Sequence, residues 1–190
     1  MSSRHRNWLL TGGIGSGKSE VRRLLDAPGL LTIDADSVGH SVLVEEGFGA
    51  VSARWPKVVV DGAIDRKALA AIVFHDRAEL AELETLTHPL IFGRIRARAE
   101  GFDGIVVVEM PLIDPDLGWP SMVVDANDET RIGRAVTRGM DHAEVESRMA
   151  SQPTRGEWLA SADLVIPNHG SLVQLEETVE MVRDFLLSQV

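Results

Sequence analysis

The chain has 190 residues, of which 44% are hydrophobic and 25% are charged, a composition typical of a folded domain with one buried core. Its 29 acidic residues outnumber its 19 basic ones, and the formal net charge of −10 argues against binding to nucleic acid or to an anionic membrane surface. The chain has no cysteine, which excludes disulfides, a thiolate nucleophile and a cysteine zinc site.

Short apolar runs predict the β-strands. In chain order they are "WLLT" (8–11), "LLTID" (30–34), "GIVVVEMP" (104–111), "MVVDA" (122–126) and "DLVIPN" (163–168). Each run is continuous rather than alternating, as expected of strands that are covered on both faces. Apolar residues at helical spacing follow the first run and recur over 80–95 and from Leu172 to Leu186. This alternation predicts an α/β fold, a P-loop NTPase-like parallel sheet of about five strands flanked by helices.

Two long helical stretches interrupt the alternation. The stretch from about 37 to 102 is almost wholly helical and far longer than a crossover needs, so we expect a helical subdomain beside the site. The stretch from about 128 to 160 is an arginine-rich helical insertion above the sheet, which is typical of a lid. Its arginines are Arg131, Arg134, Arg138, Arg148 and Arg155. We expect a single domain over 1–190, with its core formed by 1–36, 103–127 and 161–190.

The clearest motif is the loop "GGIGSGKS", which matches G-x-x-x-x-G-K-[ST] between an apolar strand and an amphipathic helix. In such a loop the backbone N–H groups turn toward phosphates, and the helix N-terminus adds partial positive charge. The residues expected to do this are Gly12, Gly13, Ile14, Gly15, Ser16 and Gly17. Lys18 is expected to reach the outer phosphates and Ser19 to offer its hydroxyl to Mg²⁺. A glycine-rich connecting turn would not explain the lysine and the serine at these two positions.

The motif predicts a triphosphate site but leaves the reaction open. The chain lacks the N-K-x-D segment of guanine-specific switches, and a lid that excludes water favours a kinase acting on a small molecule. Asp34 and Asp36 follow the second predicted strand at the carboxyl edge of the sheet, where ligands of open α/β folds bind. Asp36 can orient or deprotonate an attacking hydroxyl, or it can simply cap the next helix.

Taken together, the motifs resemble those of dephospho-coenzyme A kinases. The loop and "IDAD" are followed in order by "DGAIDRKALAAIVF" (61–74), "LETLTHPLI" (83–91), "EMPLI" (109–113), "DETRIGRAVTR" (128–138) and "ADLVIPNHG" (162–170). The resemblance implies transfer of the γ-phosphoryl group of ATP, with Mg²⁺, to the ribose 3′-hydroxyl of dephospho-coenzyme A. It covers nearly the whole chain.

The resemblance also implies roles for single residues. Asp36 matches the acidic residue proposed as base, Thr11 the threonine before the loop, and Arg134 the lid arginine at the transferring phosphate. Asn168 and Gly170 match the loop that borders the adenine of ATP. The region from about 38 to 100 matches the part that holds the coenzyme A precursor. In it, the candidate substrate contacts are Asp36, His40, His88 and Arg94.

Several of these residues have an ordinary structural interpretation as well. His88 can be a polar group within a helix bundle, and an arginine such as Arg94 is favourable late in a helix without any ligand. Arg131 and Arg138 can pair with nearby acidic residues on a solvated helix face. Trp158 and the other tryptophans are more typical of packing than of adenine stacking.

Some positions depart from the family pattern. Glu20 stands where a threonine usually contacts the α-phosphate, and we expect its carboxylate to point away from the nucleotide, toward solvent or toward Arg23. Trp158 replaces an arginine, His40 stands where many members have arginine, and "PLIDP" lacks the final carboxylate of the family segment. These changes bear on nucleotide affinity and lid contacts rather than on the class of reaction.

Two other functions remain open at this stage. One is another small-molecule kinase of the nucleoside monophosphate or shikimate type, and the other is a regulatory protein that binds ATP without turning it over well. No apolar run approaches the roughly 20 residues of a membrane span, and "MSSRHRNW" lacks a signal-peptide core, so we expect a cytoplasmic protein. The scattered histidines do not predict a metal cage.

Overall fold

The computed structural model describes residues 5–111 and 117–190, so Asp114 and most of the "PLIDP" segment lie outside the described residues. The chain divides into two compact units. The sheet unit consists of Met1–Ile33 and Phe102–Val190, and the helical unit of Asp34–Gly101. Each unit is described by itself below. No helix in the described ranges is both long and apolar enough to cross a lipid bilayer.

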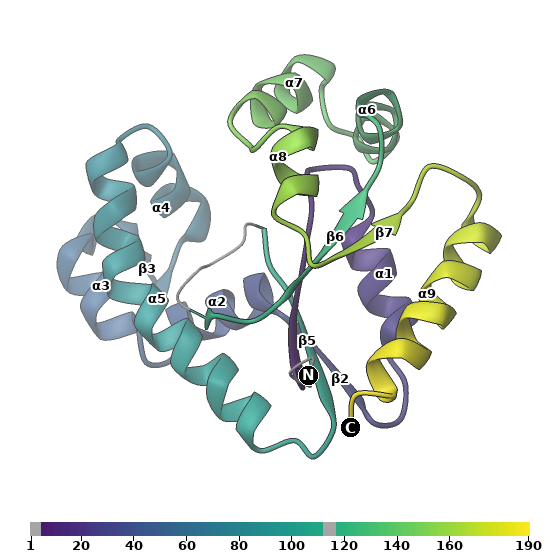
Figure 1. Cartoon of the computed structure of the whole chain (residues 1–190). Helices are drawn as coiled ribbons and strands as arrows, with labels where there is room; N and C mark the ends of the chain where they lie inside the picture. Colours follow the sequence, from purple (N-terminus) through teal and green to yellow (C-terminus); the bar gives the residue numbers. More distant parts are fainter. Residues whose placement is uncertain (1–4, 112–116) are drawn as a thin grey trace. The chain divides into compact units, whose positions relative to one another are not determined.

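The sheet unit is built on a five-stranded sheet (Figure 1). Its strands are β1 (Asn7–Thr11), β2 (Leu30–Asp34), β5 (Ile105–Glu109), β6 (Ser121–Asp125) and β7 (Leu164–Pro167). They lie in the order β2-β5-β1-β6-β7, and β1 pairs in parallel with both β5 and β6, as does β6 with β7. The predicted strands are thus confirmed, with β5 shorter at both ends than the apolar run that predicted it.

Two helices pack together beside the sheet. α1 (Lys18–Leu25) and α9 (Leu172–Leu187) lie side by side, as the purple and yellow ribbons of Figure 1 show. Their apolar faces join the strands in one core, whose fully buried members include Leu10, Val21, Leu25, Val107, Met122 and Leu186. Leu172 does not join this core: it is 53% exposed, since it is the first residue of α9 and begins the helix at the protein surface.

The arginine-rich stretch forms three helices, which confirms a helical insertion between β6 and β7. They are α6 (Asp128–Thr137), α7 (His142–Ala150) and α8 (Arg155–Ala160). Each helix is capped by the side chain of the residue before it, which accepts a backbone N–H of the first turn. The capping residues are Asn127, Asp141 and Thr154, respectively. Such caps satisfy donors that a helix cannot satisfy itself, and they fix where each helix begins.

The helical unit has a core of its own. Its elements are α2 (Ala35–Val44), α3 (Phe48–Arg54), the 3₁₀ helix η1 (Pro56–Val58), β3 (Val59–Val60), β4 (Ala63–Ile64), α4 (Arg66–Val73) and α5 (Arg77–Glu100). The residues buried together are Val51, Trp55, Val58, Leu69 and Val73. Because the helical unit has its own core, its own residues can form a binding site for a ligand.

One expectation about the helical unit was wrong, and one open alternative is excluded. The stretch is not almost wholly helical, because β3 and β4 form an antiparallel hairpin around Asp61 and Gly62, whose φ angles are 50° and 78°. An Asp-Gly pair between apolar residues is a strong hairpin signal, and it was readable in "VVVDGAI". The residue that caps α2 is Asp34, which accepts the N–H of Ser37 at 3.1 Å, and not Asp36. Asp36 lies in the first turn of α2.

Candidate active site

The glycine-rich loop connects the end of β1 to the start of α1. Gly17, the residue before α1, has φ 100°, and a Cβ there would lie 2.3 Å from the amide nitrogen of the Asn168 side chain. A Cβ at Gly12, with φ 142°, would lie 2.6 Å from the carbonyl oxygen of Val124. Both positions therefore require glycine, for conformation and for space. Thr11, the last residue of β1, is fully buried, and no described residue hydrogen-bonds with its Oγ1.

The reactive end of the loop carries a lysine and a serine on the first turn of α1. Lys18 Nζ donates to the carbonyl oxygens of Gly12 at 2.7 Å and Gly13 at 3.3 Å, so the ammonium lies over the loop backbone. Ser19 Oγ donates to Glu109 Oε1 at 2.8 Å. The expected cation and the expected hydroxyl are thus both at the loop.

Glu109, the last residue of β5, was not among the residues predicted for the site. Its second carboxylate oxygen accepts Arg22 Nε at 2.6 Å, so Ser19 and Arg22 hold the two oxygens of the same carboxylate. The available signal was an acidic residue that ends the buried strand run "GIVVVE". In a parallel sheet this position lies at the carboxyl edge, beside the loop that follows the neighbouring strand β1.

Arg134 and Asn168 contact each other, and both bind the loop at the carbonyl oxygen of Ser16. Arg134 donates to the Asn168 carbonyl at 3.1 Å, to the Asn168 side-chain oxygen at 3.1 Å and to the carbonyl of Ser16 at 3.3 Å. Asn168 is 5% exposed and donates its own amide to Ser16 O at 2.8 Å. Burial, and to a smaller extent the nearby Arg138 charge, lowers the pKa of the Arg134 guanidinium. An anion bound here would relieve the cost of burying that charge.

A cavity of about 600 Å³ lies beside this cluster. Its lining combines the loop (Gly15, Gly17), α1 (Glu20), α6 (Arg134 and Arg138) and the apolar start of α9. Asn168 contributes to this cavity and also to a smaller one of about 320 Å³, in which Gly170 takes part. A cavity with both apolar walls and converging polar groups, beside a phosphate-type loop, is typical of a nucleoside site.

Glu20 pairs with Arg23, as expected. Arg23 donates to the two Glu20 oxygens at 2.5 and 3.2 Å, and this hydrogen bond holds the pKa of the Glu20 carboxyl below its usual value. Glu20 also borders the 600 Å³ cavity. Its charge is therefore neutralised in part by an arginine while it lies at the edge of the candidate nucleotide site.

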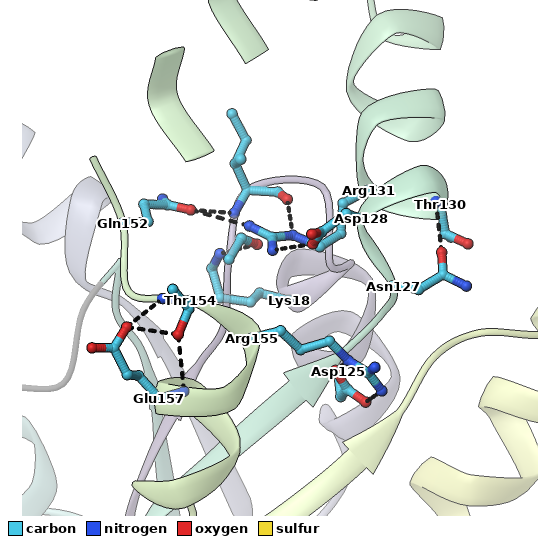
Figure 2. Close-up of polar contacts among 12 residues, drawn as sticks. Lys18, Asp125, Asn127, Asp128, Thr130, Arg131, Gln152, Thr154, Arg155 and Glu157 are labelled. Carbon is cyan, nitrogen blue, oxygen red and sulfur yellow. Dashed lines mark hydrogen bonds and ion pairs between the residues drawn. The ribbon is translucent and has the colours of Figure 1, made fainter. Parts of the chain in front are cut away.

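The expectation that Arg131 lies on a solvated helix face was wrong. Its pairing with Asp128 is confirmed, at 3.0 Å, but the residue is only 4% exposed. Arg131 Nε donates to the carbonyl oxygen of Ile14 at 3.0 Å, and Gln152 Oε1 accepts the Ile14 N–H at 2.8 Å. Figure 2 shows Arg131 and Gln152 pointing toward each other, with their dashed contacts between them. Neither residue was a sequence-based candidate for the site.

An ion pair between an exposed arginine and a buried carboxylate fixes the start of α8. Arg155 donates to both oxygens of Asp125, at 2.8 and 2.7 Å (Figure 2). His169 Nε2 lies 3.1 Å from the same carboxylate. The Arg155 hydrogen bonds hold the pKa of Asp125, the last residue of β6, below its usual value. By contrast, Arg148 is exposed and pairs with Glu144 on the same helix, which leaves it away from the loop.

The helical unit has a cavity of about 720 Å³, which includes His40. Arg66, the first residue of α4, places Nη2 2.7 Å from His40 Nε2, and Lys67 lines the same cavity. Arg66 was present in the quoted "DRKALA" but was not singled out. His88 lies against Phe92, with ring centroids 5.3 Å apart, and Arg94 pairs with Glu45 at 2.6 Å and with Glu46. Of the candidate substrate contacts, the described lining of this cavity includes His40 alone.

Comparisons with known proteins agree with this site. A family model described as dephospho-CoA kinase matches residues 9–174. A dephospho-CoA kinase from Streptomyces avermitilis is 41% identical over 181 residues, which cover 90% of this chain and 88% of the relative. A crystal structure from Thermus thermophilus has a TM-score of 0.83 at 32% identity and covers 96% of this chain and 98% of its own. Dephospho-CoA kinase from Campylobacter jejuni shares the fold, with a TM-score of 0.75 at 24% identity over 97% of this chain and 98% of its own.

These matches span the loop, the helical unit and the lid, and they do not favour a kinase of another small-molecule class or a regulatory nucleotide-binding protein. The chain therefore belongs to the dephospho-CoA kinase family, the kinases that phosphorylate dephospho-CoA in the last step of coenzyme A biosynthesis.

Proposed function

We propose that the loop 12–19 holds the phosphates of ATP and that the 600 Å³ cavity beside it holds the nucleoside. The observation that carries this proposal is that Arg134 and two glycines of the loop line that cavity, while Lys18 lies over the backbone of the same loop. A lysine, an arginine and helix-terminal N–H groups together supply the charge that a triphosphate needs. Asn168 orients Arg134, and Gly170 leaves room for the side chain of Gln174.

Ser19 and Glu109 fit a magnesium ion bound with the nucleotide. Mg²⁺ takes oxygen ligands and usually keeps several waters, so that one or two protein oxygens and the phosphates suffice. The Ser19 hydroxyl and the Glu109 carboxylate already lie 2.8 Å apart. When bound, Mg²⁺ neutralises charge on the outer phosphates.

For the acceptor we propose the helical unit. The 720 Å³ cavity combines apolar walls with His40, Arg66 and Lys67, which suits a ligand with both apolar and anionic parts such as dephospho-CoA. Asp36, in the first turn of α2, is the proposed base for the ribose 3′-hydroxyl. His88 and Arg94 remain proposed substrate contacts, although Arg94 would first have to leave Glu45 and Glu46.

These groups should differ in how much they contribute to the rate of phosphoryl transfer. The transition state of phosphoryl transfer is loose, so positioning and charge neutralisation outweigh proton abstraction. Lys18 and Arg134 neutralise charge on the phosphates, whereas Asp36 acts on the hydroxyl. We therefore expect Lys18→Ala and Arg134→Ala to lower the rate of transfer about a hundredfold or more, and Asp36→Asn to lower it less.

The test is ADP release by the purified chain with Mg-ATP, with and without dephospho-CoA. Acceptor-dependent ADP supports the proposal, and its absence refutes it. Single-turnover rates of the three variants then test the ranking, with Arg148→Ala as a control because that arginine only pairs with Glu144 on the surface. If Asp36→Asn proves the slowest of the three, the ranking is wrong.

A further inference from the structure

Ile14, the third residue of the phosphate loop, has both of its backbone polar groups bound by side chains from outside the loop. Its N–H donates to Gln152 Oε1 at 2.8 Å, and its carbonyl oxygen accepts Arg131 Nε at 3.0 Å. Arg131 Nη2 also donates to Gln152 Oε1, at 3.4 Å. The two side chains and the Ile14 backbone thus form one closed hydrogen-bonded group, which Figure 2 shows around Arg131 and Gln152.

Arg131 lies close to the backbone of the two glycines on either side of Ile14. A Cβ at Gly13 would lie 2.0 Å from Arg131 Nη2, and a Cβ at Gly15 would lie 2.2 Å from the Arg131 carbonyl oxygen. The loop therefore packs directly against Arg131, and a side chain at Gly13 would displace the guanidinium while one at Gly15 would meet the backbone of α6. These two glycines make room for the protein's own α6 as well as for a phosphate.

Arg131 and Gln152 are themselves well anchored. Arg131 is 4% exposed and also donates to Asp128 at 3.0 Å. Gln152 lies between α7 and α8, where its backbone N–H donates to Met149 O at 3.1 Å. Three residues farther on, Arg155 fixes the chain to Asp125. A fixed donor and a fixed acceptor can restrict the backbone that they bind.

We propose that Arg131 and Gln152 are positioning residues that hold the phosphate loop in its nucleotide-binding conformation before ATP arrives. The role in ATP binding rests on the proposed function of loop 12–19. A glycine-rich loop has a large conformational freedom to lose, and holding it in place beforehand reduces the free-energy cost of binding. Arg131 and Gln152 act through Ile14, and the contacts with phosphate are left to Lys18, Arg134 and the other loop N–H groups.

The first test needs no nucleotide. Amide hydrogen exchange at Ile14, followed by NMR in the full-length protein, reports whether its N–H is held. In Gln152→Leu, which removes the acceptor at similar size, we expect exchange of the Ile14 amide to accelerate about tenfold or more. Gln152→Glu keeps an acceptor oxygen and should restore protection, while amides of β1 stay protected in both variants. Unchanged exchange at Ile14 in Gln152→Leu overturns the proposal.

The second test separates binding from catalysis. If Arg131 and Gln152 order the loop, losing either side chain weakens ATP binding equally in the ground state and the transition state. The KM for ATP should then rise about tenfold with kcat nearly unchanged. We expect this for Gln152→Leu and Arg131→Lys, with recovery in Gln152→Glu and no effect in the control Arg148→Ala. The KM for dephospho-CoA should not change. An unchanged KM for ATP, or a loss confined to kcat, overturns the proposal.

A double variant makes the test sharper. Arg131→Lys and Gln152→Leu disturb the same residue, so their combined effect on the KM for ATP should be smaller than the product of the single effects. Strict multiplication of the two effects contradicts a shared group. If the wild-type protein shows no acceptor-dependent ADP release while exchange at Ile14 responds as expected, the proposed function fails and the ordering of the loop stands.

Discussion

Two opposing electrostatic effects act on Glu20. A carboxylate in the first turn of a helix is stabilised by the helix dipole. The same helix end forms part of the proposed triphosphate site, and Glu20 borders the cavity beside it. The ion pair with Arg23 turns the carboxylate toward a cation on the next turn of α1. This explains how an acidic side chain is tolerated beside the loop.

Replacing Glu20 by threonine should therefore lower the KM for ATP. We expect about a threefold decrease, since one partly neutralised charge at a helix end is worth only about 0.3–1 kcal/mol. Steady-state kinetics at low ionic strength measure it, with Glu144→Thr on α7 as the matched control. An unchanged KM would mean that position 20 does not face the nucleotide.

Asp125 predicts a pH dependence of stability. Arg155 holds its pKa below the usual value of about 3.9. The carboxylate therefore stabilises the fold fully above that usual pKa, and this contribution is lost as the pH falls through the lower pKa of the folded state. Because the Arg155 side chain is 44% exposed, solvent weakens the pair, and Asp125→Asn should lower the free energy of unfolding by about 1 kcal/mol at pH 7.

Urea unfolding at several pH values tests this. The difference between wild type and Asp125→Asn should shrink as the pH falls below about 4. Glu144→Gln, in an exposed pair with Arg148, should change stability by less than about 0.5 kcal/mol throughout. A difference that persists undiminished at pH 2 would mean that the charge of Asp125 is not what stabilises the fold.

Single residues also show what a sequence pattern can predict. Lys18 and Ser19 were predicted because the motif fixes them by local geometry alone. Glu109, Arg131 and Gln152 were not, because each acts on a residue far away in the chain. Whether such a residue is a surface ion-pair partner or part of a site depends on which neighbours fold onto it, and the spacing of charges along one helix does not contain that information.

At the level of elements, α9 links the core to the candidate site. Its N-cap is Ser171, whose hydroxyl and backbone form a capping box with Gln174. A Cβ at Gly170 would lie 2.0 Å from Gln174 Oε1. The glycine before the cap thus lets Gln174 reach back to the N-terminus of the helix.

Ser171→Ala should destabilise the protein by about 1 kcal/mol, because it removes an acceptor for an otherwise unpaired N–H. Gly170→Ala should also destabilise it, since the new methyl group would displace Gln174. Ser188→Ala, at the other end of α9, serves as control and should have an effect within about 0.5 kcal/mol. Urea unfolding at pH 7 measures all three, and equal effects of Ser171→Ala and Ser188→Ala would contradict a role for the cap.

The arginine-rich insertion was predicted as a lid, and its helices have different kinds of attachment. α6 is bound to the phosphate loop through Arg131 and Arg134, and α8 is bound to the end of β6 through Arg155. α7 carries the exposed Arg148. We therefore expect any lid movement to be greatest in α7 and least at the start of α6.

For the molecule as a whole, the division into two units suggests a division of labour. The sheet unit contains the phosphate loop and the nucleotide-type cavity, and the helical unit has its own core and its own cavity. A non-hydrolysable ATP analogue should therefore slow amide exchange in the loop, α6 and the start of α9.

Dephospho-CoA alone should slow amide exchange chiefly between residues 34 and 101, including α4. Hydrogen exchange with mass spectrometry on the full chain compares the two ligands. Dihydroxyacetone phosphate, an anion without a nucleoside or a pantetheine arm, is the control. It should not reproduce in full the pattern of slowed amide exchange of either ligand. Protection by dephospho-CoA that is confined to the sheet unit would contradict the assignment of the acceptor to the helical unit.

By itself, the sequence determined the strands, the phosphate-type loop, the reaction class and the family, because these depend on local periodicity, on glycine conformation and on motifs that are contiguous in the chain. It also carried the Asp-Gly hairpin signal that was overlooked. Only the tertiary structure decided that Asp34 rather than Asp36 caps α2, that Arg131 is buried, and that Glu109 and Gln152 lie against the loop. The physical reason is that burial and hydrogen-bond partners are set by residues distant in sequence, and a single side chain meets them only when the chain folds.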